Sequence, residues 1–281
     1  NKVLVSRFQG TWMTLYYKRK KYLKLLLNVD FYMAMRFKSD LCIMTDDGTQ
    51  GDFIMRKIQP KHPDFRFWVN GVDRQQFNNE LVDQIANKYN LDNRFSLISV
   101  SRLEGWKRVD RVINIVRIFC EQYPNYKDQL TYLIVGEGVD RERLENMVKQ
   151  YNLTNQIHFV GAVPNNQVSS YLKACQVFMS FYDLSNVGNP LLEAMRMNKV
   201  IMTLSNGDTS KWISHKKTGF IYSPKNNFYE EVANDLALLF KDDELIENIT
   251  GELLSFSDKN LWTWKERLDE EVKTVESKLK C

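Results

Sequence analysis

The sequence has little of what several protein classes require. Its four cysteines are scattered and form no Cys-x-x-Cys pair, which argues against a zinc knuckle or a disulfide framework. Free cysteines fit a reducing compartment, so we expect a cytoplasmic protein. The three histidines are also far apart, and the sequence therefore indicates no metal site. No apolar run approaches the ~18 residues that cross a membrane.

The charge of the chain is unevenly distributed. The net charge is +4, but residues 1–66 contain 13 Lys/Arg and 6 Asp/Glu. Much of this excess lies in Lys18–Lys24, where tyrosines lie next to the cations. Such a run predicts contact with an anionic membrane surface or an anionic acceptor; the alternative is a solvated face. Nucleic acid is not expected as a partner, because the chain is only mildly basic and shows no recognition motif.

Hydrophobic periodicity predicts a parallel α/β sheet in the middle of the chain. Between residues 93 and 205, short apolar runs alternate with segments of helical spacing, a pattern typical of βαβ units. The expected strands are 95–101, 130–135, 156–160, 176–181 and 200–204. The expected helices between them are 110–121, 140–151, 166–174 and 190–197. Three further helices are expected at 227–240, 243–255 and 261–279.

The first part of the chain reads as an incomplete α/β domain. The pattern predicts strands at 2–8, 40–44 and 65–69, and helices at 12–27 and 49–58. These strands are too few to close a stable sheet alone. The chain also begins inside a strand pattern and without Met, so we expect an N-terminal part to be missing from this sequence.

Two basic residues follow the first strand of the central series. Arg102 and Lys107 lie just past the strand expected at 95–101, where open α/β sheets bind ligands. A guanidinium binds two oxygens of a diphosphate, and an ammonium acts as a point charge. The pair therefore predicts diphosphate binding; the alternative is an exposed basic loop.

The segment Gly188–Glu193 begins a helix. Its Gly-Asn-Pro turn predicts outward-pointing backbone N–H groups at Asn189, Leu191 and Leu192, which suit an anion. Glu193 is expected in the first turn, where a carboxylate can accept two hydrogen bonds from a ribose diol. The alternative is that the charge of Glu193 only complements the helix dipole.

A glycine-rich segment, Gly136-Glu-Gly138, does not fit a dinucleotide fingerprint. The position of the third glycine is occupied by Arg141, and the segment follows a middle strand instead of the first one. NAD binding is therefore not expected.

Six segments, taken in order, resemble those of the retaining glycosyltransferases of family four, which have the GT-B fold. They are 68–73 (Trp-Val-Asn-Gly-Val-Asp) with the following Phe77, 101–107 (Ser-Arg-Leu with Lys at its end), 133–138, 157–161, 188–195 and 218–220. Each segment alone is a weak signal. All six in the family's order are a strong one.

The resemblance implies an α/β protein with two Rossmann-like domains in the GT-B arrangement. Residues 1–73 would be the C-terminal part of the acceptor domain. Residues 74–258 would form the nucleotide-sugar donor-binding domain, and 259–281 would be a C-terminal helix that crosses back to the acceptor domain.

The resemblance also implies a reaction. A sugar of the hexose type would move from a nucleotide-diphosphate sugar to an acceptor hydroxyl with retention of the anomeric configuration, without a metal or a cofactor. The acceptor would be a glycan or a lipid-linked molecule, as in polysaccharide biosynthesis. The protein would then be cytoplasmic, or peripheral on the inner face of the membrane.

The resemblance assigns roles to particular residues. Arg102 and Lys107 would be catalytic, because they would stabilise the departing diphosphate in place of a divalent ion. Glu193 would bind the ribose, and backbone groups from Gly161 to Val163 would pair with the base. The remaining residues implied in donor binding are Ser185, Asn186, Gly188, Asn189, Leu191 and Leu192.

Two positions depart from the family pattern. Ser185 stands where members commonly carry a glutamate, and Gln9 stands where many carry a histidine; Gly10 and Thr11 complete this acceptor-side segment. Glutamine cannot take a proton, although an oxygen of the diphosphate can act as the base. The alternative hypothesis is therefore a non-catalytic nucleotide-sugar-binding paralogue, or a subunit of a glycosylation complex.

Overall fold

The structure, a computed structural model, describes residues 2–61, 64–74, 76–224 and 228–279. The chain divides into two compact units. Unit 1 combines Asn1–Asp73 with Leu261–Cys281, and unit 2 is Arg74–Asn260. Because each unit has its own sheet, the two are described separately.

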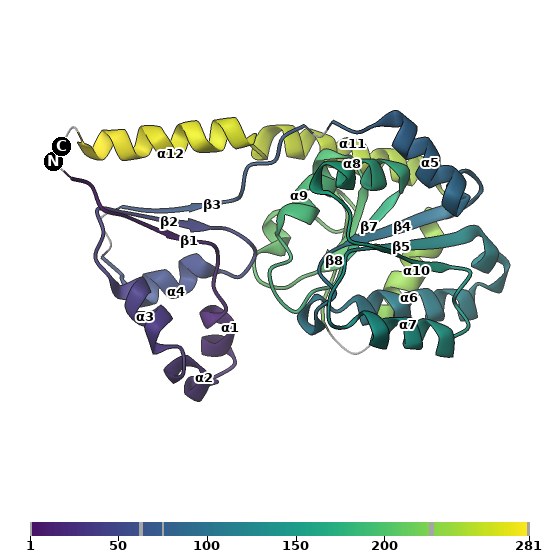
Figure 1. Cartoon of the computed structure of the whole chain (residues 1–281), viewed down its shortest axis with the longest axis horizontal. Helices are drawn as coiled ribbons and strands as arrows, with labels where there is room; N and C mark the ends of the chain where they lie inside the picture. Colours follow the sequence, from purple (N-terminus) through teal and green to yellow (C-terminus); the bar gives the residue numbers. More distant parts are fainter. Residues whose placement is uncertain (1, 62–63, 75, 225–227, 280–281) are drawn as a thin grey trace. The chain divides into compact units, whose positions relative to one another are not determined.

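Unit 2 is built on a parallel sheet of six strands in the order β6-β5-β4-β7-β8-β9 (Figure 1). The strands are β4 (Phe95–Val100), β5 (Leu130–Val135), β6 (Ile157–Gly161), β7 (Val177–Ser180), β8 (Val200–Leu204) and β9 (Phe220–Tyr222). The helices are α5 (Asn79–Tyr89), α6 (Val109–Gln122), α7 (Arg141–Gln150), α8 (Asn165–Ala174), α9 (Asn189–Arg196), α10 (Phe228–Leu239) and α11 (Asp243–Asn260). The α/β parallel-sheet class expected from the sequence is confirmed.

Apolar runs explain the layers of unit 2. Strands β5, β7 and β8 are buried along their whole length, as expected for strands covered by helices on both faces. Helices α6, α7 and α10 cover one face, and α5, α8, α9 and α11 cover the other (Figure 1). Helix α6 turns Val112, Val116 and Phe119 into the core at helical spacing. Because helices cover both faces of the sheet, the ends of its strands are where a binding site is expected.

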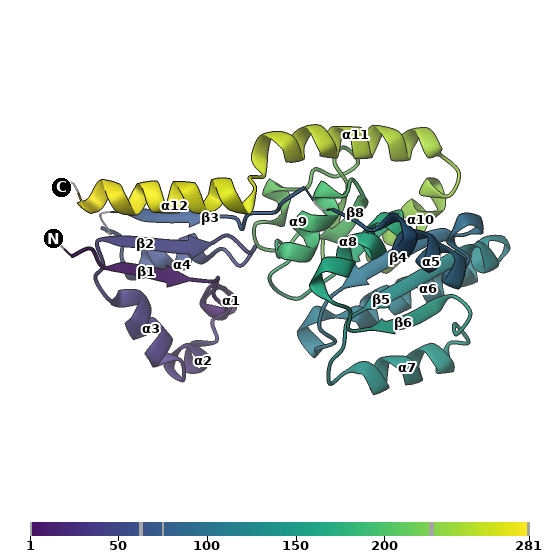
Figure 2. The same ribbon diagram turned by 45° about the horizontal axis from the view of Figure 1, so that its top comes forward.

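Unit 1 contains a smaller parallel sheet in the order β1-β2-β3. Its strands are β1 (Val5–Phe8), β2 (Leu41–Thr45) and β3 (Phe65–Trp68). Its helices are α1 (Met13–Lys18), α2 (Tyr22–Leu26), α3 (Val29–Arg36), α4 (Gly51–Ile58) and α12 (Trp264–Leu279). Helix α12 runs beside β3 (Figure 2), although the two segments are far apart in the chain.

The contact between α12 and β3 depends on one buried cation. The Arg267 side chain is only 2% exposed, and its guanidinium carbon lies 4.5 Å from the ring centroid of Trp68 and 5.4 Å from that of Trp262. Its charge is balanced by Glu271, 2.8 Å away. Stacking on two indoles and pairing with one carboxylate together make this buried charge tolerable.

The prediction of one helix over 12–27 is wrong. Two short helices, α1 and α2, occupy this region, and Lys20 between them has φ +54°. A left-handed backbone at a residue other than glycine interrupts a right-handed helix. The sequence analysis also missed α5, α3 and the short strand β9, while β5 and β8 have the bounds expected from the sequence. None of the helices in the described part of the chain has the length and apolar character needed to cross a bilayer.

Gly136 is required by a close approach between the loops that follow β4 and β5. Its φ is +140°, and a Cβ would lie 1.8 Å from the carbonyl oxygen of Ser101. We expect Gly136→Ala to lower the free energy of unfolding by at least about 2 kcal/mol in urea denaturation. Gly251, in α11, is the matched control because a Cβ there meets nothing within 4 Å. Gly251→Ala should raise stability by about 0.5–1 kcal/mol, and equal effects at both positions would contradict this account.

Candidate functional site

The carboxyl ends of β4 and β7 mark the point where the order of the large sheet reverses. From β4 the chain moves through β5 to β6 on one side, and from β7 through β8 to β9 on the other. Open α/β sheets form ligand crevices at such a switch point. Arg102 and Lys107 follow β4, and Ser185–Glu193 follow β7. The structure therefore brings together two groups of predicted residues that are distant in the sequence.

Lys107 connects the two sides of this point. Its Nζ lies 4.0 Å from the ring centroid of Trp106 and 4.1 Å from that of Tyr182. The loops also share a main-chain hydrogen bond, because the N–H of Asp183 donates to the carbonyl of Trp106 at 2.9 Å. Two aromatic faces hold the ammonium in place by cation–π attraction. The cation is therefore positioned before any ligand arrives.

Arg102 is the more exposed of the two predicted cations. Its side chain is 71% exposed, and its Nη1 pairs with Glu104 Oε1 at 2.9 Å. The other oxygen of Glu104 accepts a hydrogen bond of 2.5 Å from the indole N–H of Trp106. An exposed pair of this kind is weak. An incoming anion can therefore exchange with Glu104 for the guanidinium.

A network of arginines behind these cations was missed by the sequence analysis. Arg108 donates to Asp110, and Arg111 donates to Asp183 Oδ1 at 2.7 Å and to the carbonyl of Phe181 at 2.6 Å. The hydrogen bond that Arg108 donates to Asp110 raises the pKa of Arg108 above its usual value. These bonds fix the start of α6 to the end of β7. The only signal in the sequence was the series of charged residues directly after Lys107.

Asn186 holds the shape of the loop after β7. The residue is 1% exposed, its Oδ1 accepts from the N–H of Tyr182 at 3.1 Å, and its Nδ2 donates to the carbonyl of Tyr182 at 3.0 Å. Its Nδ2 also donates to Asn206, whose own amide donates to the same carbonyl at 2.8 Å. The adjacent Ser185 has φ +57° and is half-buried. The Asn186 side chain is thus engaged by the protein and supports the loop.

The expectation of outward-pointing N–H groups at the start of α9 is partly wrong. The N–H groups of Leu191 and Leu192 both donate to the carbonyl of Gly188, at 3.0 and 3.3 Å. They close the first turn of the helix and do not point to a ligand. Pro190 has no N–H, and Asn189 is exposed. The helix start therefore contributes its dipole more than its donors.

Glu193 is half-buried and lies in the second turn of α9 instead of the first. Burial raises the pKa of its carboxyl to about 7 from an ordinary value of 4.5. A carboxylate stabilised by the helix dipole would show the opposite direction, so dipole complementation does not describe this residue. Its charge therefore changes near neutral pH, which is unusual for a glutamate.

The loops after β5 and β6 pack against the same edge of the sheet. A Cβ on Gly138 would lie 2.3 Å from the carbonyl oxygen of Leu103, so this glycine permits close contact between its loop and the loop after β4. The carbonyl of Gly161 accepts from the N–H of Gly136 at 2.9 Å. That carbonyl is therefore engaged, while Val163 is half-buried between the exposed residues Ala162 and Pro164.

The predicted acceptor-side residues follow β1 in unit 1. Gln9 is exposed. Gly10 has φ +85°, and a Cβ there would lie 2.3 Å from the Asp47 carboxylate. The N–H of Thr11 donates to Thr49 Oγ1 at 3.1 Å, and that hydroxyl donates to Asp47 at 2.6 Å. Asp47 was missed by the sequence analysis, although an Asp-Asp-Gly turn directly after a buried strand was its signal.

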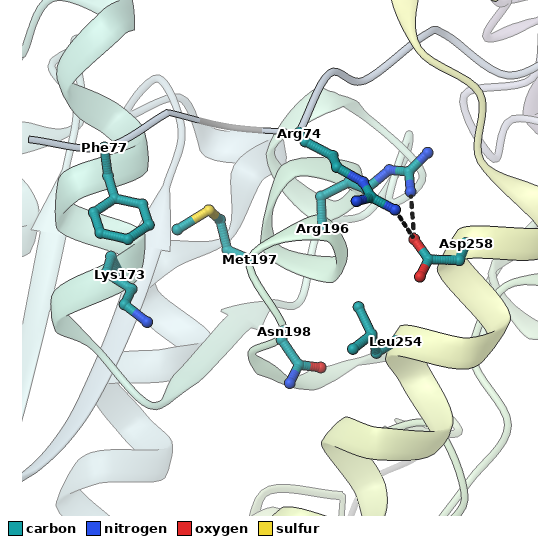
Figure 3. A pocket seen from close by; sticks show the side chains of 8 residues that line it. All are labelled: Arg74, Phe77, Lys173, Arg196, Met197, Asn198, Leu254 and Asp258. Carbon is teal, nitrogen blue, oxygen red and sulfur yellow. Dashed lines mark hydrogen bonds and ion pairs between the residues drawn. The ribbon is translucent and has the colours of Figure 1, made fainter.

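The far end of α9 is fixed by charge (Figure 3). Arg196, the last residue of α9, and Arg74 both donate to Asp258 Oδ1, at 3.0 and 3.4 Å. The Arg196 side chain is only 6% exposed. A pocket of about 370 Å³ adjoins this cluster and is also lined by Phe77 and Leu254. It lies at the opposite end of α9 from Gly188, and thus away from the switch point.

Metal ligands do not gather at the switch point or elsewhere in the described residues. No group of three or more His, Cys, Asp or Glu side chains in that part of the chain lies close enough to hold an ion.

The sequence of unit 2 has a known counterpart. Residues 81–251 match the profile of the family described as glycosyl transferases group 1, which is more than half of the chain. The chain belongs to this family. As a group 1 glycosyl transferase, it is 27% identical over 190 residues to an uncharacterized glycosyltransferase of Methanocaldococcus jannaschii, covering 67% of this chain and 47% of that protein.

A second relative comes from Campylobacter jejuni. It is an N-acetylgalactosamine-N,N'-diacetylbacillosaminyl-diphospho-undecaprenol 4-alpha-N-acetylgalactosaminyltransferase, 23% identical over 210 residues, covering 74% of this chain and 53% of that protein. The chain thus spans about half the length of the curated relatives it matches.

Solved structures establish the fold of this group 1 glycosyl transferase. The crystal structure of Anabaena HepE in complex with UDP and glucose has a TM-score of 0.79 and 19% identity, covering 98% of this chain and 72% of that one. The likeness confirms the GT-B fold expected from the sequence.

The raised pKa of Glu193 predicts a pH-dependent stability. The unfolded carboxyl loses its proton near pH 4.5 and the folded one near 7, so the folded state loses stability as pH rises between these values. Glu193→Gln removes this loss. The free energy of unfolding of the Glu193→Gln variant minus that of the wild type should be about 1–3 kcal/mol larger at pH 8 than at pH 5 in urea titrations.

The exposed Glu252 of α11 supplies the control for this measurement. Glu252→Gln should change stability by the same small amount at both pH values. A Glu193→Gln difference that is also independent of pH would refute the assignment.

Proposed function

We propose that this group 1 glycosyl transferase moves a sugar from a nucleotide-diphosphate sugar to an acceptor hydroxyl, with retention of configuration and without a metal ion. One observation carries the proposal. A pre-positioned ammonium, that of Lys107, lies at the switch point of a parallel sheet, beside the helix that bears Glu193. The cation suits the diphosphate of a nucleotide, and the half-buried carboxylate suits its ribose.

The cations would bind and stabilise the diphosphate. As the bond between the sugar and the diphosphate breaks, negative charge grows on the leaving oxygens, and fixed positive charges lower the energy of that state. Lys107 is held rigidly over two rings, which avoids the cost of ordering it. Arg102 would leave Glu104 and bind two oxygens with its planar fork. Together they would supply the charge that a divalent ion supplies elsewhere.

Glu193 would recognise the ribose. An ionised carboxylate is an acceptor only and can bind both hydroxyls of a diol. The base would then lie toward the loop after β6, where Val163 follows the engaged carbonyl of Gly161. The HepE structures contain UDP and UDP-glucose, which makes uridine nucleotides the first to test.

Retention would follow from attack on the face that the diphosphate leaves. The acceptor oxygen forms a bond to the anomeric carbon while the bond to the diphosphate breaks, and the acceptor proton passes to an oxygen of the departing diphosphate. This route needs no protein base, and Gln9 is an exposed amide. We also propose that the chain belongs to family four of the retaining glycosyltransferases.

The acceptor would be a glycan or a lipid-linked molecule of the cell envelope. The name of the Campylobacter jejuni relative includes a diphospho-undecaprenol acceptor, which supports a lipid-linked class. We place the protein in the cytoplasm or on the inner face of the membrane. In this proposal, unit 1 would bind the acceptor and unit 2 would bind the nucleotide-sugar donor.

Removal of the fixed cation should weaken donor binding. We expect Lys107→Ala to raise the Kd for UDP-glucose at least about tenfold in calorimetric titration, because one charge-assisted contact is lost. Lys88→Ala, an exposed lysine on α5, should leave the Kd unchanged. The proposal fails if the wild-type chain binds none of UDP, GDP and ADP. Binding without sugar transfer by the complete protein would favour the non-catalytic paralogue instead.

Donor binding should also depend on pH through Glu193. The diphosphate of UDP-glucose does not titrate near neutral pH, so the ligand itself contributes no change. If only the ionised carboxylate binds the ribose, a pKa of about 7 makes affinity about tenfold higher at pH 8 than at pH 6. Glu193→Gln should bind more weakly and show no such slope. The same slope in both proteins would exclude the ribose role.

A further inference from the structure

The segment Lys18–Leu27 forms a surface that we call the basic apolar tip. It has the sequence Lys-Arg-Lys-Lys-Tyr-Leu-Lys-Leu-Leu-Leu, with five cations, five apolar side chains and no acid. It includes α2 and the bend at Lys20. Helix α2 lies at the end of unit 1 away from its sheet (Figures 1 and 2). Both views therefore show the tip projecting from the unit.

The leucines of the tip face in two directions. Leu25 is half-buried and packs against the core of unit 1. Leu23, Leu26 and Leu27 are 70–74% exposed, and their spacing of three and four residues places them on one side of the chain. One leucine thus anchors the tip while three remain in water. Burial within unit 1 does not account for those three.

Exposed apolar side chains also recur every four residues along α3 and at its end. Val29 and Met33 are 54% and 59% exposed, and Phe37 is 60% exposed. Single exposed apolar residues are common, but a continuous series of them on one protein marks an interaction site. The only acid between Lys18 and Phe37 is Asp30. The surface is therefore both apolar and positive.

The cations of the tip are available to an external partner. No salt bridge joins Lys18–Lys24 to a carboxylate in the described part of the chain. Lys18 contacts the Gln50 amide and the Phe53 ring, and Lys24 lies 5.6 Å from the Tyr16 ring centroid. All five cationic residues are exposed. Their charge is thus directed to solvent, around the exposed leucines.

We propose that the basic apolar tip docks on an anionic lipid bilayer. Leu23, Leu26 and Leu27 would enter the boundary between headgroups and acyl chains, as the apolar face of an interfacial helix does. The cations around them would bind the anionic headgroups, whose surface potential attracts basic clusters. The docking itself stands without the proposed function. Its consequence, that the sugar acceptor is presented at a membrane surface, rests on that function.

Vesicle co-sedimentation tests this surface. The chain should partition at least about tenfold more strongly to vesicles of mixed phosphatidylglycerol and phosphatidylcholine than to phosphatidylcholine alone. Raising NaCl from about 0.05 M to about 0.5 M should reduce that binding, because salt screens the headgroup attraction. Failure to sediment with anionic vesicles at low salt would overturn the proposal.

Matched variants separate the two contributions. Leu23→Glu combined with Leu26→Glu should reduce binding at least about tenfold, and Lys20→Gln combined with Lys21→Gln should abolish the preference for anionic vesicles. Leu268→Glu combined with Val272→Glu is the control, since it makes the same change on exposed positions of α12. Equal losses in the control and the leucine variant would refute a specific tip. Self-association through these leucines without vesicle binding would also overturn it.

A second measurement keeps this proposal distinct from the donor site. The affinity for UDP-glucose should be unchanged in the leucine variant, because the tip belongs to unit 1 and the cations of the donor site belong to unit 2. Vesicle binding without nucleotide binding would leave the tip in place and remove the proposed function. Nucleotide binding without vesicle binding would overturn the docking proposal and leave the proposed function in place.

Discussion

A single main-chain hydrogen bond, from the N–H of Asp183 to the carbonyl of Trp106 at 2.9 Å, joins the two loops that flank the switch point. It brings Tyr182 against Lys107, and the arginine network behind it repeats the connection with side chains. The cation, the aromatic rings and the start of α9 therefore keep their positions relative to one another. The entropy cost of ordering these groups therefore arises when the protein folds, and not when a ligand binds.

Charge in this protein is used in two physically different ways. At the switch point a few cations are held by rings and carboxylates at defined positions, which suits recognition of one small anion. On the basic apolar tip of unit 1, five exposed cations have no carboxylate partner among the described residues, which suits a broad and fluid anionic surface. The cations of this chain thus form two separate groups with different surroundings, and not one extended basic face.

The sequence predicted what depends on local pattern and missed what depends on tertiary contact. The buried apolar runs of β5 and β8 determined their bounds, because continuous apolar strands have few alternatives. The break at Lys20 could not be seen, since every neighbouring residue is a good helix former. Arg102, Lys107 and Glu193 could be placed at the strand ends, whereas Asp183 and Asp47 gain their roles from partners distant in the chain. The direction of the Glu193 pKa likewise required the burial that only folding produces.

Helix α9 is fixed by different forces at its two ends. Its first turn is closed by the N–H groups of Leu191 and Leu192 on the carbonyl of Gly188, and the Asn186 amide holds the loop before it; salt hardly affects these neutral hydrogen bonds. Its last residue, Arg196, depends on Asp258, a carboxylate that is 43% exposed and shared with Arg74. Ionic strength therefore weakens the ion pairs at this end of the helix more than the hydrogen bonds at its start. Added salt should therefore be felt at the carboxyl end of α9 before it is felt at the end that faces the switch point.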